Sequence, residues 1–333
     1  LGRVENLGFS LRDEASLSTL TEEVVKSSAI EGEALDRDEV RSSIARQLGM
    51  DLAGLPEPGR VVEGVVEMML DATRHYSEPL TVERLFAWHA ALFPTGRSGM
   101  RSIAVGAWRP ADGGKMRVVS RRDRAERVHF EAPAAFRLED EMAKFLQWFA
   151  DRDSTDPVLR AGIAHFWFVT IHPFEDGNGR IARAIGEMAL AQADGTQHRT
   201  YSMSSGMEAR RAEYYQQLES AQRGSLDITA WLAWFLDCLE YTLDGADEVL
   251  QGVLAKARVL ERVGAQAVSD RQRLVIRHML DSGEAKMTTS IYAQIAGCSN
   301  DTALRDIKEL VGSGVLVRND GGGRSTSYRV GSV

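Results

Sequence analysis

One helix that must be buried on all sides constrains this chain of 333 residues more than any other feature. Apolar side chains occupy most positions of residues 157–171 instead of forming one stripe, so a helix there needs other helices around it. Pro173 cannot continue that helix, and it disfavours helical backbone at His172. We therefore expect the polar residues that follow to form a loop at the end of a rigid, buried helix.

Composition agrees with a globular protein and excludes several other classes. Hydrophobic residues make up 44% of the chain and charged residues 26%, which excludes wholesale disorder. The net charge of −8 is not that of a general nucleic-acid coat, although it leaves room for a local basic patch. Only two cysteines occur, Cys238 and Cys298, which excludes a disulfide scaffold and a cysteine-rich metal cluster. We find no apolar run long enough for a membrane span and no signal-peptide core in the first 20 residues, so we expect a cytoplasmic protein without a membrane partner.

Helical spacing of apolar residues covers most of the first 245 positions and predicts a mainly α fold. Within residues 15–48, Thr21 resembles a helix start and Asp36 offers a second N-cap. Residues 94–135 are instead punctuated by glycines between short β-prone pieces such as Ser102–Val105, which predicts an irregular hairpin. The other helices are expected at residues 60–76, 81–93, 137–151, 157–171, 177–194, 207–223 and 227–243.

The rest of the chain divides into an apolar helix and a separate compact unit. An apolar stripe predicts a helix that serves either dimerisation or packing between domains, and it consists of Val249, Leu250, Val253, Leu254, Ala257 and Leu260. Residues 270–333 contain three helical segments, the third over Asp301–Ser313, and two strands, which is the order of a winged helix-turn-helix domain. Its charges nearly balance, so a DNA partner and a protein partner both stay open. The predicted boundaries are 1–59 for an N-terminal helical region, 60–245 for the core, 246–269 for a helical linker and 270–333 for the winged helix.

The sharpest motif is the polar loop His-Pro-Phe-Glu-Asp-Gly-Asn-Gly-Arg at residues 172–180, with Arg183 three positions further on. Gly177 and Gly179 permit close approach of a ligand. Their N–H groups, with the start of the next helix, form an anion-binding nest. Arg180 and Arg183 lie on nearly the same helix face, where they can contact phosphate oxygens. The spacing therefore predicts a phosphate site.

Two further side chains supply chemistry to that site. Asp176 offers the hard oxygen ligand that Mg²⁺ prefers alongside phosphates, and His172 can take a proton near neutral pH. Together they predict transfer of a phosphorus-containing group from a nucleotide to a hydroxyl. His165 has no carboxylate at metal-ligand spacing, and no histidines are spaced for a helical zinc site.

The pattern His-x-Phe-x-Asp-Gly-Asn-Gly-Arg-x-x-Arg resembles the signature of the Fic family, whose members are mostly protein adenylyltransferases. The defining positions present here are His172, Phe174, Asp176, Gly177, Asn178, Gly179, Arg180 and Arg183. The resemblance extends over residues 15–245 and implies a helical core with a β-hairpin flap, matched by the stretch from Ala107–Arg109 to Val128–Phe130. The flap implies a target protein that docks there by β-augmentation. A winged-helix appendage is also common in this family.

The resemblance also implies roles for these residues. His172 is the general base toward a Ser, Thr or Tyr hydroxyl, a role worth roughly 10²–10⁴-fold in rate. Phe174 packs in the core and fixes the loop, and Asp176 holds Mg²⁺ on the phosphates of ATP. The remaining residues are nucleotide contacts: Gly177, Asn178 and Gly179 for phosphate oxygens, Arg180 with support from Arg183 for the γ-phosphate, and Tyr214, Tyr215 and Gln222 for the nucleoside.

The stretch Ser27-Ser28-Ala29-Ile30-Glu31-Gly32 resembles the family's inhibitory motif, in the class that carries its inhibitory helix at the N-terminal side. It implies that Glu31 pairs with Arg183 and intrudes where the γ-phosphate must lie. ATP then binds with its α-phosphate misaligned, and a displacement of about 1 Å can cost 10²-fold in rate. The same glutamate activates water to remove AMP in some relatives, and the sequence permits that reverse reaction.

The function predicted from the sequence is therefore an autoinhibited protein adenylyltransferase that uses Mg²⁺ and ATP. Two alternatives stay open. One is a transferase of the same fold that uses another nucleotide donor, and the other is a DNA-binding regulator whose Fic domain senses a nucleotide. The target protein, the signal that relieves inhibition and the oligomeric state, a homodimer included, are not predicted.

Overall fold

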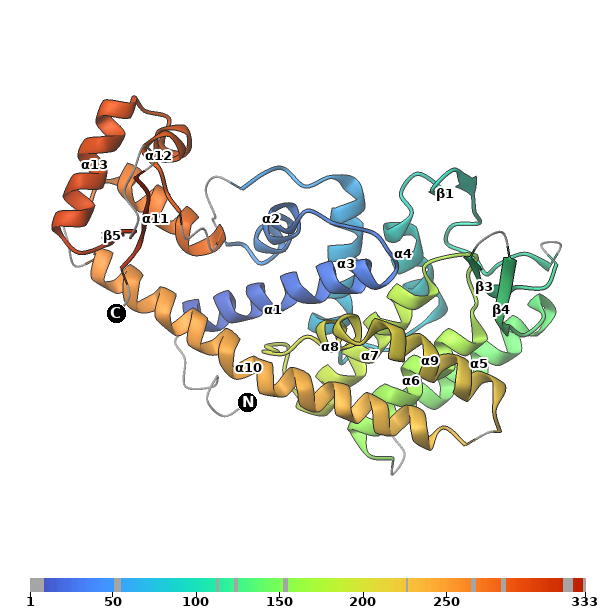
Figure 1. Cartoon of the computed structure of the whole chain (residues 1–333). Helices are drawn as coiled ribbons and strands as arrows, with labels where there is room; N and C mark the ends of the chain where they lie inside the picture. Colours follow the sequence, from blue (N-terminus) through green and yellow to red (C-terminus); the bar gives the residue numbers. More distant parts are fainter. Residues whose placement is uncertain are drawn as a thin grey trace.

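The computed structural model describes residues 9–50, 55–111, 114–122, 125–151, 155–225, 227–264, 268–282, 286–319 and 326–331. Within these residues the chain forms two bodies, each with its own apolar core, joined by one long helix (Figure 1). We call residues 9–246 the main body and residues 259–331 the C-terminal unit. The mainly α fold predicted from the sequence is confirmed.

The two helices that flank the motif form the centre of the main body. α6 (Pro157–Ile171) and α7 (Asn178–Asp194) make the most extensive helix–helix contact in the described part of the chain. The carboxylate of Asp156 caps α6 by accepting from two backbone N–H groups, and Pro157 occupies the first turn, where its missing N–H costs nothing. The surrounding helices are α1 (Phe9–Ile30), α2 (Arg37–Gln47), α3 (Arg60–Arg74), α4 (Val82–Leu92), η2 (Ala135–Arg137), α5 (Leu138–Ala150), α8 (Met203–Ala209) and α9 (Arg211–Arg223).

The two helix starts expected near the N-terminus have different outcomes. Asp36 is the N-cap of α2, because its side chain accepts from the N–H groups of Asp38 and Glu39 at 2.9 and 3.0 Å. The prediction for Thr21 is wrong. α1 passes through it without a break, and the Thr21 hydroxyl donates to the Leu17 carbonyl at 2.6 Å within the same helix.

Strands are confined to short pieces of the glycine-rich region. β3 (Arg117–Arg122) and β4 (Ala125–Glu131) form an antiparallel hairpin with a register shift between Val118 and Val119. β1 (Arg97–Ser98) and β2 (Arg101–Ser102) form a second, minimal pair. The expected flap is therefore shorter than predicted, since Ala107–Arg109 is not a strand. The N–H of Arg109 donates to the Pro173 carbonyl at 2.8 Å, so this segment is bound to the motif loop instead.

A single helix, α10 (Thr229–Gly264), replaces the two helices expected at residues 227–243 and 249–260 (Figure 1). The expected linker at 246–269 is thus mainly the second half of α10. Its first half packs in the core of the main body, while Val259 and Val263 are buried in the C-terminal unit. Of the predicted apolar stripe, only the side chain of Leu254 lies within the described residues.

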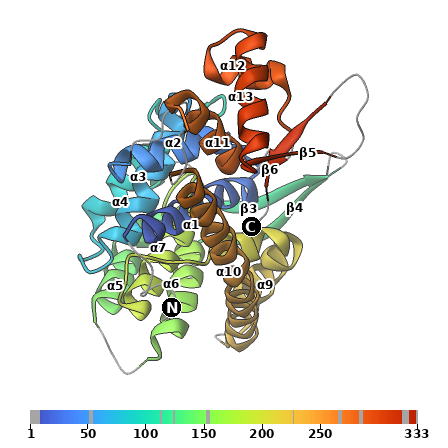
Figure 2. The ribbon, with the colours of Figure 1, turned by 90° about the vertical axis from the view of Figure 1, so that its left-hand side faces the viewer.

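The C-terminal unit lies at the far end of α10 from α9 in both views (Figures 1 and 2). It contains α11 (Asp270–Ser282), α12 (Thr289–Ala296), α13 (Asn300–Gly312) and the antiparallel pair β5 (Leu316–Arg318) and β6 (Tyr328–Val330). α13 is capped by the Ser299 hydroxyl and not by Asp301, which lies inside its first turn. Across the described residues, no helix combines the length and apolarity that crossing a bilayer requires.

Candidate functional site

The motif loop turns sharply at His172, which ends α6 in the left-handed conformation with φ of 53°. No other non-glycine residue in the described part of the chain has a positive φ, and such backbone is costly unless its surroundings enforce it. The ring Nδ1 lies 3.2 Å from the Val169 carbonyl. A carbonyl only accepts, so Nδ1 carries the proton and Nε2 keeps its lone pair free.

Burial holds His172 in its neutral form, although the Val169 hydrogen bond and two nearby carboxylates favour the protonated ring. Burial is the main cause that lowers its pKa to about 4, and the positive charge of Arg109 lowers it further. Glu31 and Asp176 act in the opposite direction. At neutral pH this imidazole is therefore unprotonated, as a general base must be.

Phe174 and Asn178 hold the loop together from inside. Phe174 is fully buried and its ring stacks on His89, with centroids 4.1 Å apart, so it fixes the loop from within the core. The Asn178 amide accepts from the Phe174 N–H and donates to the Phe174 carbonyl, both at 2.9 Å. This differs from the expected phosphate contact. Both polar atoms of the Asn178 side chain are engaged by the backbone of Phe174, so this side chain stabilises the loop.

Asp176 lies at the loop surface, where Ser98 and Gly177 orient its carboxylate. One oxygen accepts from the Ser98 hydroxyl and the other from the Gly177 N–H at 2.6 Å. No group of three or more metal-ligating side chains occurs in the described residues. A single oriented carboxylate fits Mg²⁺, which keeps most of its coordination for phosphates and water.

The two motif arginines are buried, and each meets an acidic residue from the end of α1. Arg183 donates to the Glu31 carboxylate at 2.8 Å, and to the Ser27 hydroxyl and carbonyl at 2.8 Å each. Arg180 donates to the Glu33 carboxylate at 2.5 Å. Arg183 Nη1 and Arg180 Nε have no acceptor within the described residues. Buried guanidinium groups with unused donors suit a phosphate ligand.

Gly32 and Gly179 make the approach of α1 to α7 geometrically feasible. Gly32 has φ of +85°, a conformation that glycine adopts readily, and it lies in the turn that follows the end of α1 at Ile30. A Cβ on Gly179 would lie 2.1 Å from a Glu31 carboxylate oxygen. The Glu31 carboxylate therefore lies directly over the nest that the sequence assigns to phosphate.

A cavity of about 540 Å³ opens beside His172, and its lining includes Glu31 and Gly179. The three nucleoside positions expected from the sequence all line it, although Tyr214 is almost wholly buried and its hydroxyl lies 2.9 Å from His165 Nε2. The Tyr215 hydroxyl donates to the Ile30 carbonyl at 3.0 Å, and Gln222 donates to Thr170 at 3.2 Å. The cavity thus joins the base, the nest and the expected nucleoside residues.

Sequence reasoning missed several residues of this site. His129 of β4 and Glu219 of α9 both line the cavity and contact each other at 2.6 Å. Ser98 and Arg109 come from the irregular region and carry no local signal. Glu33 did carry a local signal, because it is a second acidic residue two positions after Glu31.

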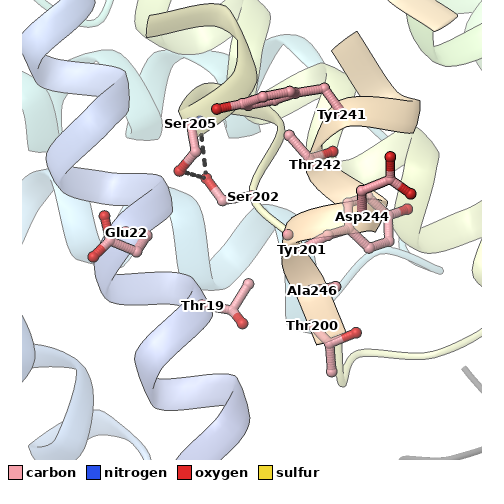
Figure 3. A pocket seen from close by; sticks show the side chains of 11 residues that line it. Thr19, Glu22, Thr200, Tyr201, Ser202, Ser205, Tyr241, Thr242, Asp244 and Ala246 are labelled. Atoms are coloured by element: carbon pink, nitrogen blue, oxygen red, sulfur yellow. Dashed lines mark hydrogen bonds between the residues drawn. The ribbon is translucent and has the colours of Figure 1, made fainter. Parts of the chain in front are cut away.

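A second cavity, of about 480 Å³, lies between α1 and α10 and contains no motif residue (Figure 3). Its lining is rich in hydroxyl groups and carries the carboxylates of Glu22 and Asp244, but no lysine or arginine. Figure 3 shows Ser202 and Ser205 hydrogen-bonded to each other at its edge. A lining without positive charge does not suit a nucleotide phosphate, so this cavity is not the candidate site.

Comparison with known proteins agrees with this assignment. A family model described as Fic/DOC family matches residues 79–190, and one described as a domain of unknown function (DUF4172) matches residues 1–50. A protein named protein adenylyltransferase Fic from Drosophila mojavensis is 26% identical over 223 residues, which is 66% of this chain and 40% of that protein. Its namesake from Drosophila melanogaster is 35% identical over 105 residues, 31% of this chain and 20% of that protein. The chain thus spans less than half the length of these relatives.

Solved structures show the same fold at low identity. A Fic family protein from Desulfovibrio desulfuricans is 22% identical with a TM-score of 0.52, over 98% of this chain and 89% of that chain. A Fic domain containing signaling protein from Bacteroides thetaiotaomicron is 18% identical with a TM-score of 0.55, over 75% of this chain and 95% of that chain. The motif, the fold and the family model coincide, and we conclude that this chain carries a Fic/DOC family domain at residues 79–190.

Proposed function

We propose that this protein is an autoinhibited adenylyltransferase that transfers AMP from ATP to a Ser, Thr or Tyr hydroxyl of a target protein or of itself. One observation carries the proposal: a neutral His172 with a free Nε2 shares its cavity with a glycine nest bordered by two buried arginines. The similarity to proteins named adenylyltransferases supports the same activity.

In the proposed reaction the target hydroxyl oxygen attacks the α-phosphorus of ATP. A new oxygen–phosphorus bond forms, the bond between the α-phosphorus and its bridging oxygen breaks, and pyrophosphate leaves with that electron pair. The hydroxyl proton goes to Nε2 of His172. Backbone N–H groups of the nest and the two arginines stabilise the charge on the phosphates. Asp176 would hold Mg²⁺, which neutralises phosphate charge when bound.

We further propose that Glu31 and Glu33 together form the inhibitory device. The Glu31 carboxylate occupies the space over Gly179 and takes a donor of Arg183, while Glu33 takes a donor of Arg180. A bound triphosphate would have to displace both carboxylates. Removal of Glu31 alone therefore opens the nest but leaves Arg180 engaged, and Glu33→Gln should add to the effect of Glu31→Gly.

The test is intact-mass measurement after incubation with ATP and Mg²⁺. We expect Glu31→Gly to gain one or more AMP-sized increments about 10²-fold faster than wild type, with a further increase in the double variant with Glu33→Gln. Adding His172→Ala should remove the gain. Equal rates for wild type and Glu31→Gly would refute the inhibitory role, and activity that survives His172→Ala would refute the base.

The same assay decides the donor. Incubation with GTP, CTP and UTP in place of ATP tests the alternative of another nucleotide donor, because the phosphate nest does not recognise the base. AMP release from the modified protein by wild type but not by Glu31→Gly would support Glu31-dependent removal of AMP.

A target protein is proposed to dock at the β3–β4 hairpin.

A second candidate function is DNA binding by the C-terminal unit, because α13 carries two exposed cations and one of its three acids is buried. Asp306 is 4% exposed and accepts from Arg271, and Glu309 accepts from Gln272, so these two acids are engaged within the unit. The exposed side chains of α13 include Arg305 and Lys308, and also the acids Asp301 and Glu309. We propose that this unit is a winged helix whose α13 faces duplex DNA. Affinity for duplex DNA that falls steeply with salt would support this, and absence of binding at low salt would exclude it.

A further inference from the structure

We propose that Arg109 is a positioning residue for His172: it holds the motif loop in its left-handed turn and keeps the general base in its orientation. The proposal rests on the proposed transferase function. It assigns a role to a residue that lies 63 positions from the base in the sequence and outside the motif.

Arg109 binds the motif loop at two consecutive carbonyl groups. Its backbone N–H donates to the Pro173 carbonyl at 2.8 Å, and its Nε donates to the His172 carbonyl at 2.8 Å. Its Nη2 donates to the Pro133 carbonyl, just beyond the β3–β4 hairpin. The side chain is 5% exposed, so water does not compete for these bonds. One guanidinium therefore joins the motif loop to the chain on both sides of the hairpin.

The neighbouring Trp108 reinforces this attachment from the apolar side. Its ring lies against Phe174, with centroids 5.1 Å apart, and against Phe86 at 4.6 Å. The loop is thus held by ring packing on one side and by charge-assisted hydrogen bonds on the other. A positive-φ residue such as His172 stays in that conformation only when several contacts enforce it.

The charge of Arg109 also acts on the imidazole. The charged groups with the largest effect on His172 are Arg109 from the segment before the hairpin, Glu31 from the turn after α1 and Asp176 from the motif loop. His129 of β4 and Arg211 and Glu219 of α9 line the same cavity. Arg109 favours the neutral ring, while Glu31 and Asp176 favour the protonated one. When Glu31 is removed or displaced, Arg109 and Asp176 remain as the opposing charges, and loss of Arg109 would then favour the protonated ring.

Arg160 provides a matched control for a purely structural role. It is also a buried arginine, 8% exposed, and it donates to two backbone carbonyls, those of Trp148 and Phe149, at 3.1 and 3.0 Å. Those carbonyls belong to the end of α5 and not to the motif loop. Arg160→Gln should therefore reproduce the loss of a buried guanidinium without affecting the base.

The experiment compares Arg109→Gln, Arg109→Lys and Arg160→Gln, all in the Glu31→Gly protein. Self-modification rates are measured at saturating ATP from pH 3.5 to 8, a range that includes the pKa of His172 at about 4. We expect Arg109→Gln to lower kcat about 10-fold or more with little change in KM for ATP, and to move the acid limb up by about 0.5 to 1 pH unit. Arg109→Lys keeps the positive charge but loses the paired donors of the guanidinium group. It should therefore lower kcat without moving the acid limb of the pH–rate profile. Arg160→Gln should change neither.

A second readout does not depend on activity. The imidazole of His172 is titrated by NMR in the wild-type protein and in Arg109→Gln, with His172→Gln used to assign the signal. An upward shift of the titration midpoint supports the proposal even if the Glu31→Gly protein proves inactive and the transferase function fails. An unchanged midpoint, or rates for Arg109→Gln that match Arg160→Gln in folded proteins, would overturn it.

Discussion

The main body and the C-terminal unit bury charge for different purposes. In the main body, Arg180 and Arg183 are both 2% exposed, and each retains an unused donor beside a carboxylate that a ligand could replace. In the C-terminal unit, Asp306 is 4% exposed and fully engaged by Arg271 and Tyr292. The comparison teaches that burial of charge alone does not mark a site. A binding site is marked by a buried charge whose present partner a ligand can replace.

The largest effect that tests this contrast is the loss of His172 from the main body. In the Glu31→Gly protein, His172→Ala should lower the transfer rate by roughly 10²–10⁴-fold because the proton acceptor is gone. Thermal unfolding should change little, since His172 is only half-buried and its ring makes one hydrogen bond, to Val169. Rates are followed by intact mass, and Asp306→Asn serves as a control that should leave them unchanged.

The next largest effect is a difference in acid stability, because low pH should destabilise the main body more than the C-terminal unit. Burial lowers the pKa of His89 to about 4 and of His165 to about 3, and both side chains are fully buried in the main body. An unfolded histidine takes a proton near pH 6.5, so these groups stabilise the fold above that pH. Their contribution is lost as the pH falls below 6.5, by about 2 kcal/mol each at pH 5.

We therefore expect the unfolding transition of the main body to move to lower temperature between pH 7 and pH 5. The transition of the C-terminal unit should move less, because the pKa of Asp306, lowered by its hydrogen bond from Arg271, keeps that carboxylate ionised. Calorimetry at both pH values resolves the two. Equal shifts of both transitions would contradict the assignment of acid sensitivity to the buried histidines.

The smallest effect is confined to the C-terminal unit. Asp306→Ala leaves the Tyr292 hydroxyl without its acceptor in a buried position, at a cost of about 1–3 kcal/mol in the free energy of unfolding of that unit. Transfer by the Glu31→Gly protein should be unaffected. A matched loss of activity would show that the two bodies are coupled through α10, and would weaken the distinction between a structural and an exchangeable buried charge.

Much of the site was predictable because it is contiguous. The residues from His172 to Arg183 lie at the end of one buried helix and the start of the next, so local rules for proline, glycine and helix starts already bring them together. The contact of Glu31 with Arg183 was implied by the family resemblance. The inward orientation of the Asn178 amide was not predictable, because an asparagine in a loop gives no local sign of which backbone groups it binds.

Errors arose where one local pattern fits two structures. Thr21 resembled a helix start but satisfies its hydroxyl inside α1. The apolar spacings at 227–243 and 249–260 gave two helices where the chain forms one, since no proline interrupts α10 and glycine only weakens a helix. The charge balance of residues 270–333 could not reveal that Asp306 is buried within its own unit.

By itself, the sequence determined the mainly α fold, the central buried helix, the motif loop and the α2 cap at Asp36. These features depend on periodicity and on backbone restrictions that act within a few residues. Only the tertiary structure decided that Glu33 meets Arg180 and that Arg109 holds the loop at His172. The sequence shows that a charged side chain needs a partner if it is buried. Which partner it contacts depends on how helices distant in the sequence pack together.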